Sequence, residues 1–159
     1  RRRPQMTIKQ ISTAVLTALA VSACATASVP AASFQTLEHD TMITIITDQN
    51  PETQLMALVL TMSAKAQGET PRILLCSAGG DLGLKAAPES ATTPLAPKGT
   101  SPQGLLKKLM SEGVPVDVCA IYLPNRPFGE EALLDGVGVA TPAEMGTILA
   151  QPGETVLSF

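Results

Sequence analysis

The sequence predicts an α/β domain in which a five-stranded, mostly parallel sheet is doubly wound, with helices on both faces. Two observations lead to this fold class. Short runs of β-branched and other apolar residues alternate with helical stretches, and each of the three main helical stretches opens with a capping residue followed by proline. Among doubly wound sheets we expect the flavodoxin-like strand order 2-1-3-4-5.

Five apolar segments are expected to form the strands. The first, Met42 to Thr47, is apolar and β-branched, as a parallel strand buried on both faces should be. The other four are Arg72 to Cys76, Val116 to Ile121, Val137 to Ala140 and Thr155 to Phe159.

Capping signals place the main helices between these strands. Asn50-Pro51 starts a helix that reaches about Gln67, Ser101-Pro102 starts one that ends at Gly113, and Thr141-Pro142 starts one with Met145, Ile148 and Leu149 inward. The apolar arc of the first helix is wider than one face requires. Either deep burial against the sheet or packing on another subunit explains this width.

Three shorter segments complete the expected organisation. Leu82 to Ala86 and Phe128 to Leu134 are predicted as short helices. Residues 87–100 contain several prolines and few apolar residues, so we expect an irregular surface loop there, long enough to act as a lid.

Composition limits the classes of function. Hydrophobic residues make up 45% of the 159 residues and charged residues 16%, which argues against disorder and for one folded domain. The net charge is -3, and removing the four positive charges of Arg1, Arg2, Arg3 and Lys9 leaves about -7. An acidic domain without tryptophan is poorly suited to nucleic acid, so we expect no such partner.

The first 27 residues are predicted to be a signal peptide for export across a bacterial inner membrane. A basic start to Lys9 precedes the apolar run Ile11 to Ala23, which is short for a membrane span. Two processing sites compete: Ala25-Thr26-Ala27 suits ordinary signal peptidase, whereas Val21-Ser22-Ala23-Cys24 resembles a lipobox that would make Cys24 a lipid anchor. Residues 28–40 are then a linker, and residues 41–159 form the domain, in the periplasm.

Candidate site residues follow from the rule that ligands bind at the carboxyl ends of parallel strands, near the switch point, which is expected between the first and third strands. Cys119 is the central candidate, because a thiolate is the nucleophile in sulfur transfer and redox chemistry, and Arg126 is placed to stabilise that thiolate. The alternative is that Cys119 is a small buried apolar residue. Candidates for substrate binding are Asp48, Asn50, Cys76, Tyr122 and Asn125.

Several other kinds of site are not supported. The sequence has no C-x-x-C dithiol, and its single histidine, His39, lies in the linker, so a Cys-His dyad within the domain is excluded. Two cysteines without a nearby histidine do not make a zinc site. Ser77-Ala78-Gly79-Gly80 lacks the spacing of a phosphate-binding loop.

The order of these segments resembles the DsrE/DsrF-like family over residues 41–159. The resemblance is most specific in Gly113-Val114-Pro115-Val116-Asp117-Val118-Cys119, while the stretch from Cys119 to Asn125 is similar to an exported branch of that family. It implies a sulfur-relay protein in which Cys119 carries sulfane sulfur as a persulfide, without metal or organic cofactor. It also implies a trimer or hexamer. The donor and acceptor of sulfur are not indicated.

Two functions therefore remain open at this point: a periplasmic sulfur carrier or sulfurtransferase using Cys119, and a non-catalytic module of the same fold that binds a small ligand or takes part in assembly.

In the order 2-1-3-4-5 the first strand separates the second and third, so equivalent Cα atoms of these two strands would be about 10 Å apart. A disulfide needs Cα atoms within about 7 Å. We therefore expect Cys76 and Cys119 to be unbridged.

Overall fold

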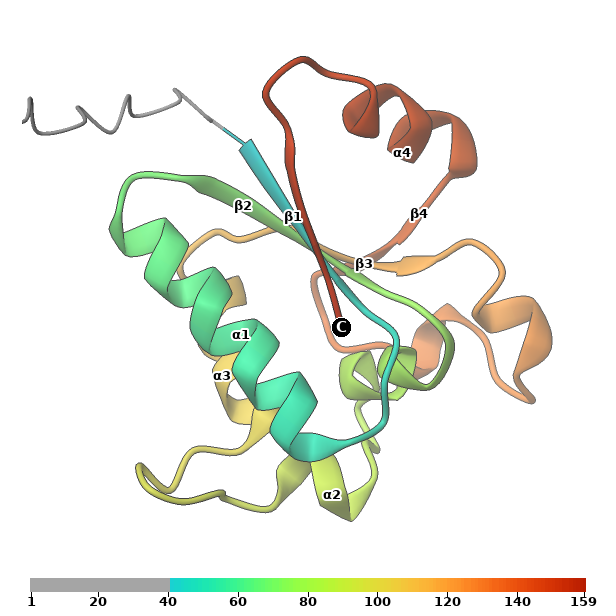
Figure 1. Cartoon of the computed structure of the whole chain (residues 1–159). Helices are drawn as coiled ribbons and strands as arrows, with labels where there is room; N and C mark the ends of the chain where they lie inside the picture. Colours follow the sequence, from blue (N-terminus) through green and yellow to red (C-terminus); the bar gives the residue numbers. More distant parts are fainter. Residues whose placement is uncertain (1–40) are drawn as a thin grey trace, which may run out of the picture. The chain divides into compact units, whose positions relative to one another are not determined.

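The computed structural model describes residues 41–159, and the predicted signal peptide (1–27) and linker (28–40) lie outside the described residues. The domain is built on one sheet of five parallel strands in the order β4-β3-β2-β1-β5 (Figure 1). The strands are β1 (Thr41–Ile46), β2 (Thr70–Leu75), β3 (Val116–Cys119), β4 (Val137–Ala140) and β5 (Thr155–Ser158). This confirms the predicted α/β class with a parallel sheet.

The predicted strand order 2-1-3-4-5 is wrong. From β1 to β4 each strand is placed beside the one before it, and only the last connection returns across the sheet to set β5 against β1. The order therefore reverses between β1 and β5 and not between β1 and β3. In consequence β2 and β3 are direct neighbours, with Leu75 paired to Val118.

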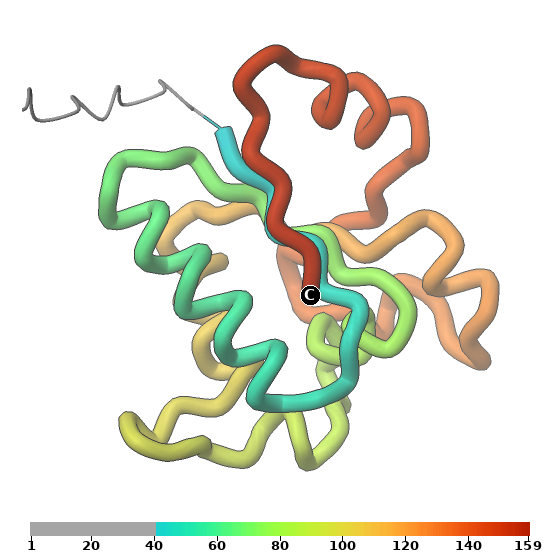
Figure 2. The backbone as a smooth tube through the Cα atoms, viewed as in Figure 1, coloured from blue at the N-terminus to red at the C-terminus, as the bar shows by residue number. Residues whose placement is uncertain are grey.

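Helices cover both faces of the sheet. α1 (Pro51–Ala66) and α3 (Pro102–Ser111) lie together on one face, and α4 (Pro142–Leu149), in the returning connection, lies on the other (Figures 1 and 2). Right-handed crossovers place helices on opposite faces when the direction of strand addition changes, which is the arrangement seen here.

The three predicted helix starts are confirmed. The side chains of Asn50, Ser101 and Thr141 each accept a hydrogen bond from a backbone N–H of the first turn, and a proline follows each of them. These oxygens satisfy donors that have no partner within the helix, and the proline ring presets the helical φ.

The larger core lies between the sheet and the helices α1 and α3, and a smaller one lies under α4. The α1 face of the sheet is filled by fully buried residues such as Ile46, Leu75 and Val118. The alternate residues of the same strands point to the α4 face, where the small core consists of Ile43, Leu74, Ala140 and Met145.

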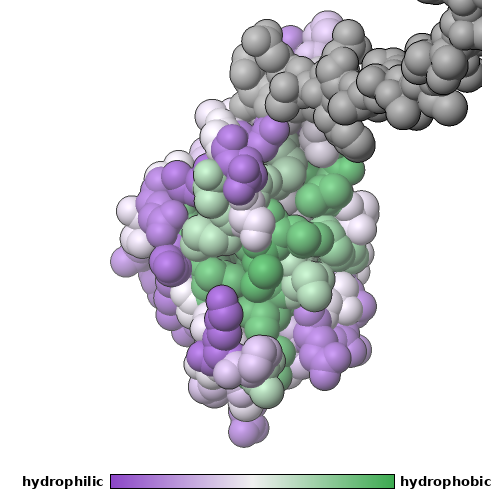
Figure 3. Space-filling view, turned by 60° about the vertical axis from the view of Figure 1, so that its left-hand side comes forward, coloured by the Kyte–Doolittle hydropathy of each residue, from purple (hydrophilic) through white to green (hydrophobic). Residues whose placement is uncertain are grey.

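Part of the apolar arc of α1 is not covered. Leu58 is fully buried, but Met56, Val59 and Leu60 expose 54%, 43% and 40% of their surface. An apolar area lies on the α1 side of the molecule (Figure 3). Burial against the sheet therefore accounts for only part of the arc.

Three short segments differ from expectation. A 3-10 helix, η1 (Ser77–Gly83), replaces the helix predicted at Leu82 to Ala86, and only η3 (Glu130–Ala132) forms within Phe128 to Leu134. The loop predicted to be irregular, residues 87–100, contains the short helix α2 (Glu89–Thr92).

No helix within residues 41–159 has the length and apolar character to cross a bilayer.

Candidate functional site

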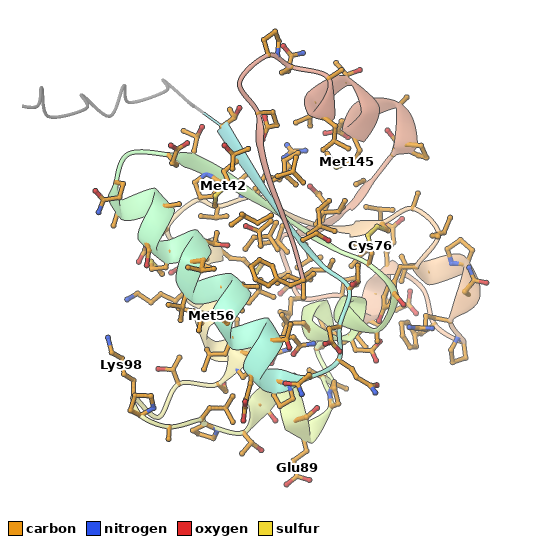
Figure 4. All side chains as sticks on the ribbon, viewed as in Figure 1. Met42, Met56, Cys76, Glu89, Lys98 and Met145 are labelled. Atoms are coloured by element: carbon orange, nitrogen blue, oxygen red, sulfur yellow. A yellow bond between two sulfur atoms is a disulfide. The ribbon has the colours of Figure 1, made fainter. Side chains whose placement is uncertain are left out.

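The centre of the candidate site is a pair of cysteines on neighbouring strands. Cys119 is the last residue of β3, and Cys76 directly follows β2. Since Leu75 pairs with Val118, the next residues along both strands, Cys76 and Cys119, lie opposite each other. Their Cα atoms are 5.1 Å apart, and their sulfur atoms form a disulfide (Figure 4 labels Cys76).

The prediction that these thiols are unbridged is thus wrong, and the reason is the strand order. With β1 between β2 and β3, two strand spacings would have separated the cysteines. With β2 beside β3, one spacing of about 4.8 Å separates them, which is within the range that a disulfide spans.

The pair lies on the α4 face of the sheet, at the carboxyl edge. Both cysteines are half-buried and pack against the small core that includes Leu74 and Ala140. Ala140 is the register partner of Cys119, and Thr141, the residue after it, caps α4. The sulfur atoms are therefore held at a surface of the domain and not in its main core.

The turn after Cys76 is fastened to β1. The Cys76 N–H donates to the Ile46 carbonyl at 2.9 Å, and the Gly79 N–H donates to the Thr47 carbonyl at 3.1 Å. A Cβ at Gly79 would clash with the Ile46 carbonyl oxygen, so this position requires glycine. These bonds hold the backbone of Cys76 in place.

A polar cluster joins this turn to the loop after Cys119. The Tyr122 hydroxyl donates to Asp81 at 2.7 Å, and the guanidinium of Arg126 lies 4.7 Å from the centre of the Tyr122 ring. Arg126 also donates to the Ser77 carbonyl at 3.2 Å and lies 3.6 Å from Asp81. Burial, with the hydrogen bond to Asp81, raises the pKa of Tyr122 to about 12.

The structure thus brings four of the predicted site residues into one region: Cys76, Cys119, Tyr122 and Arg126. Arg126 contacts the carbonyl of the residue after Cys76, and Asp81 balances part of its charge. Of the others, Asn125 donates to the Ile121 carbonyl at 2.7 Å within the same loop.

Asp48 and Asn50 lie at the end of β1 and take part in the start of α1. Asn50 caps that helix through Glu52 and Thr53, and Asp48 accepts from the Asn50 N–H at 3.0 Å. Both side chains are exposed. Their contacts within the described residues explain them as parts of the helix start, and their predicted role in substrate binding stays a prediction.

Comparison with solved structures reveals similar architectures. The chain is similar to the YchN protein of E. coli, with a TM-score of 0.58 and 23% identity over 76% of this chain and 99% of that one. It is also similar to MTH1491, a protein of unknown function from Methanobacterium thermoautotrophicum, with a TM-score of 0.53 and 20% identity over 75% and 97% of the two chains. The domain has the DsrE/DsrF-like fold. No protein-family model and no curated protein matches the sequence.

Sequence reasoning missed two features of this domain. The first is Asp81, which holds Tyr122 and Arg126 together. Its position in the turn after Gly79-Gly80 gave no distinct signal, because an aspartate is common in any turn.

The second feature that sequence reasoning missed is an ion-pair network on the α4 face, next to the cysteines. Arg72 lies 3.1 Å from Glu144 and 3.7 Å from Asp117, which is two residues before Cys119. Burial raises the pKa of Asp117, while Arg72 acts in the opposite direction. A charged residue inside an otherwise apolar strand, as in Val116-Asp117-Val118, was the signal available.

The reactive groups that this site offers are the sulfur atoms of Cys76 and Cys119. Among residues 41–159 no three histidine, cysteine, aspartate or glutamate side chains come together in a way that would hold a metal ion. Two half-buried cysteines at hydrogen-bonded neighbouring strands form a dithiol when reduced and a disulfide when oxidised, and either state reacts by thiolate exchange.

Proposed function

We propose that the protein, once its disulfide is reduced, is a periplasmic sulfur-relay protein that carries sulfane sulfur as a persulfide on Cys119. The observation that carries this proposal is the position of Cys119, half-buried at the carboxyl edge of β3 beside a second cysteine. Ligand chemistry in open parallel sheets takes place at this edge. The persulfide-forming cysteine that the family resemblance implies falls on the same residue.

The transfer is an exchange between sulfur atoms. The Cys119 thiolate attacks the outer sulfur of a donor persulfide, a Cys119–sulfur bond forms, and the sulfur–sulfur bond of the donor breaks. The donor leaves as a thiolate, and Cys119 becomes a persulfide. An acceptor thiolate takes the outer sulfur in the same way, so no net oxidation or reduction occurs and no cofactor is needed.

Two neighbouring features favour the Cys119 thiolate. Arg126 places a positive charge at the carbonyl of Ser77, the residue after Cys76, although Asp81 offsets part of that charge. The amino end of α4 begins next to Ala140, the register partner of Cys119. Positive charge and helix amino ends both lower the pKa of a thiol.

The test is a mass measurement on a protein whose only cysteine is Cys119, carrying Cys24→Ser and Cys76→Ser. After treatment with glutathione persulfide, we expect the intact mass to increase by one sulfur atom and peptide mapping to place that sulfur on Cys119. The matched control carries Cys24→Ser and Cys119→Ser and should gain none. Absence of the added sulfur on Cys119 would refute the proposal.

A second function is favoured by the disulfide itself. Disulfides persist in oxidising compartments and stabilise exported domains, so the Cys76–Cys119 bridge also suits a non-catalytic module that binds a small ligand or takes part in assembly. In that case the bridge is permanent and the cysteines do no chemistry. The two functions are distinguished on the Cys24→Ser protein, which keeps both cysteines of the bridge. Treatment of the folded protein with a dithiol should expose two thiols if the bridge is opened for sulfur relay, and none if the bridge is permanent.

We propose further that copies of the chain associate through the uncovered face of α1. This face consists of Met56, Val59 and Leu60 and borders a groove of about 840 Å³ towards residues 95–100 and α3. Light scattering after size exclusion should give a trimer or hexamer for the protein and a monomer for Met56→Lys/Val59→Lys. A monomeric parent protein would refute the assembly.

Export and anchoring are proposals that rest on residues 1–27. Fractionation of a cell that expresses the full chain should place the protein in the periplasm or on its membrane. Cys24→Ser should release it from the membrane if Cys24 is lipidated, and unchanged fractionation would favour cleavage after Ala27.

A further inference from the structure

We propose that Cys76 is the resolving cysteine of the site: it discharges the Cys119 persulfide, so that the sulfane sulfur leaves as sulfide and the Cys76–Cys119 disulfide is the product. This inference rests on the proposed persulfide chemistry of Cys119 and adds a second reacting residue and a reaction outcome to it. The observation that carries it is the bridge between two residues that lie opposite each other on β2 and β3.

The geometry places Cys76 where an attack on Cys119 needs no large movement. The Cα atoms are already 5.1 Å apart, and the cysteines share the α4 face. The hydrogen bond from the Cys76 N–H to Ile46 keeps this end of β2 on the sheet, and the register between β2 and β3 keeps Cys119 opposite. Holding two reactants in this way raises their effective concentration far above that of a free thiol.

The step balances without a cofactor. The Cys76 thiolate attacks the inner sulfur of the persulfide, which is the Sγ of Cys119. A bond forms between the two Sγ atoms, and the bond from Cys119 Sγ to the outer sulfur breaks. The electron pair leaves with the outer sulfur as hydrosulfide, so the sulfane sulfur is reduced and the two cysteines are oxidised. An external dithiol then reduces the disulfide and becomes a disulfide itself.

The same placement explains why both cysteines remain half-buried and not sealed in the core. A disulfide that only stabilises the fold needs no access, whereas one that is reduced in each cycle must be reached by a thiolate. The α4 face at this edge of the sheet is where such a thiolate would approach. Cys76 therefore lets the protein release the sulfur as sulfide without a sulfur acceptor, and an external dithiol restores the two thiols.

The experiment compares the full chain carrying Cys24→Ser with the same chain carrying Cys76→Ser in addition. Both are reduced with a dithiol, freed of it and treated with one equivalent of glutathione persulfide. Sulfide is measured by bromobimane trapping and the protein by intact mass. For the first protein we expect about one sulfide per chain and a loss of two hydrogen atoms. Cys76→Ser should keep the added sulfur and release sulfide at least about tenfold more slowly.

The outcomes separate the two proposals. If Cys76→Ser gains no sulfur, the persulfide function of Cys119 fails, and this inference fails with it. If Cys76→Ser holds the persulfide but the chain with Cys76 holds it equally long and forms no disulfide, the carrier function stands and the resolving role is overturned. Circular dichroism of each variant, together with the Cys119→Ser control, shows that the comparison is made between folded proteins.

Discussion

Reducing the Cys76–Cys119 disulfide is expected to lower the free energy of unfolding by about 4 kcal/mol and to leave the folded architecture in place. The cysteines are 43 residues apart in sequence. In the chain-entropy treatment, cross-linking a loop of this length lowers the entropy of the unfolded chain by about 13 cal/mol/K, which is about 4 kcal/mol at 25 °C. The effect lies in the unfolded state, since strand pairing and core packing hold the two residues together without the bridge.

Urea denaturation followed by far-ultraviolet circular dichroism measures this difference on the Cys24→Ser protein, with and without a phosphine reductant. The midpoint should fall on reduction, and the slope should rise, because a chain without the cross-link exposes more surface when it unfolds. The protein with both Cys76→Ser and Cys119→Ser is the control: its midpoint should lie near that of the reduced protein and should not respond to reductant.

A stability difference below about 1 kcal/mol, with equal slopes in both conditions, would refute this reasoning. Peptide mapping without reductant, made on the same sample, shows whether the bridge was present at the start. The free energy of unfolding of a domain is usually roughly 5–15 kcal/mol. The reduced form that the sulfur chemistry requires is therefore expected to remain folded, with a smaller free energy of unfolding.

Three further predictions concern groups around the sheet. Because Tyr122 is the single tyrosine of the chain and tryptophan is absent, the ultraviolet phenolate band reports on Tyr122 alone. A pH titration of this band should give a pKa of about 12 for Tyr122. Asp81→Asn should lower the pKa of Tyr122, because it removes the carboxylate that opposes ionisation. The hydroxyl of Thr61 donates to the Ala57 carbonyl and accepts from the Thr44 hydroxyl, and both threonines are fully buried. Thr61→Val leaves the Thr44 hydroxyl as a buried donor without an acceptor, so it should lower the free energy of unfolding by about 1–3 kcal/mol in urea denaturation. Thr44→Val leaves no buried donor unpaired and should therefore cost less. Burial raises the pKa of Asp117, so the folded state favours the protonated form of this side chain. Asp117→Asn should therefore have a higher free energy of unfolding than the parent at neutral pH, and this difference should disappear as the pH falls below 3.8. A difference in stability that does not change with pH would contradict this prediction.

The local structure was largely predictable because it depends on local chemistry. The three helix starts at Asn50, Ser101 and Thr141 each combine a side-chain acceptor with a proline, and all three occur where the sequence predicted them. The short segments were less predictable. Glu89–Thr92 forms one turn of helix among prolines, and a segment of this size has little propensity of its own.

Strand order could not be predicted in the same way. Each strand segment carries the same apolar signal whether its neighbour is the preceding strand or another one, and the order depends on how helices pack over the whole sheet. This one error propagated to the site: it separated Cys76 from Cys119 by an intervening strand and so excluded the bridge. The candidate residues were chosen from the sequence by their places after the strands, but the proximity of Cys76 and Cys119 depended on the order β4-β3-β2-β1-β5.

The pairing of β5 with β1 also affects how the domain reaches its native state. The contact between Thr41 and Glu154 joins residues 113 apart in sequence, whereas β1 to β4 are assembled from successive connections. Contacts of such long range form late, because the intervening chain must first lose its freedom. Until β5 arrives, β1 is an edge strand, and its segment Met42 to Ile46 is apolar and β-branched, the composition that favours pairing with other chains. β1, which lies between β2 and β5 in the folded sheet, is thus the strand that most needs protection from aggregation while the domain folds.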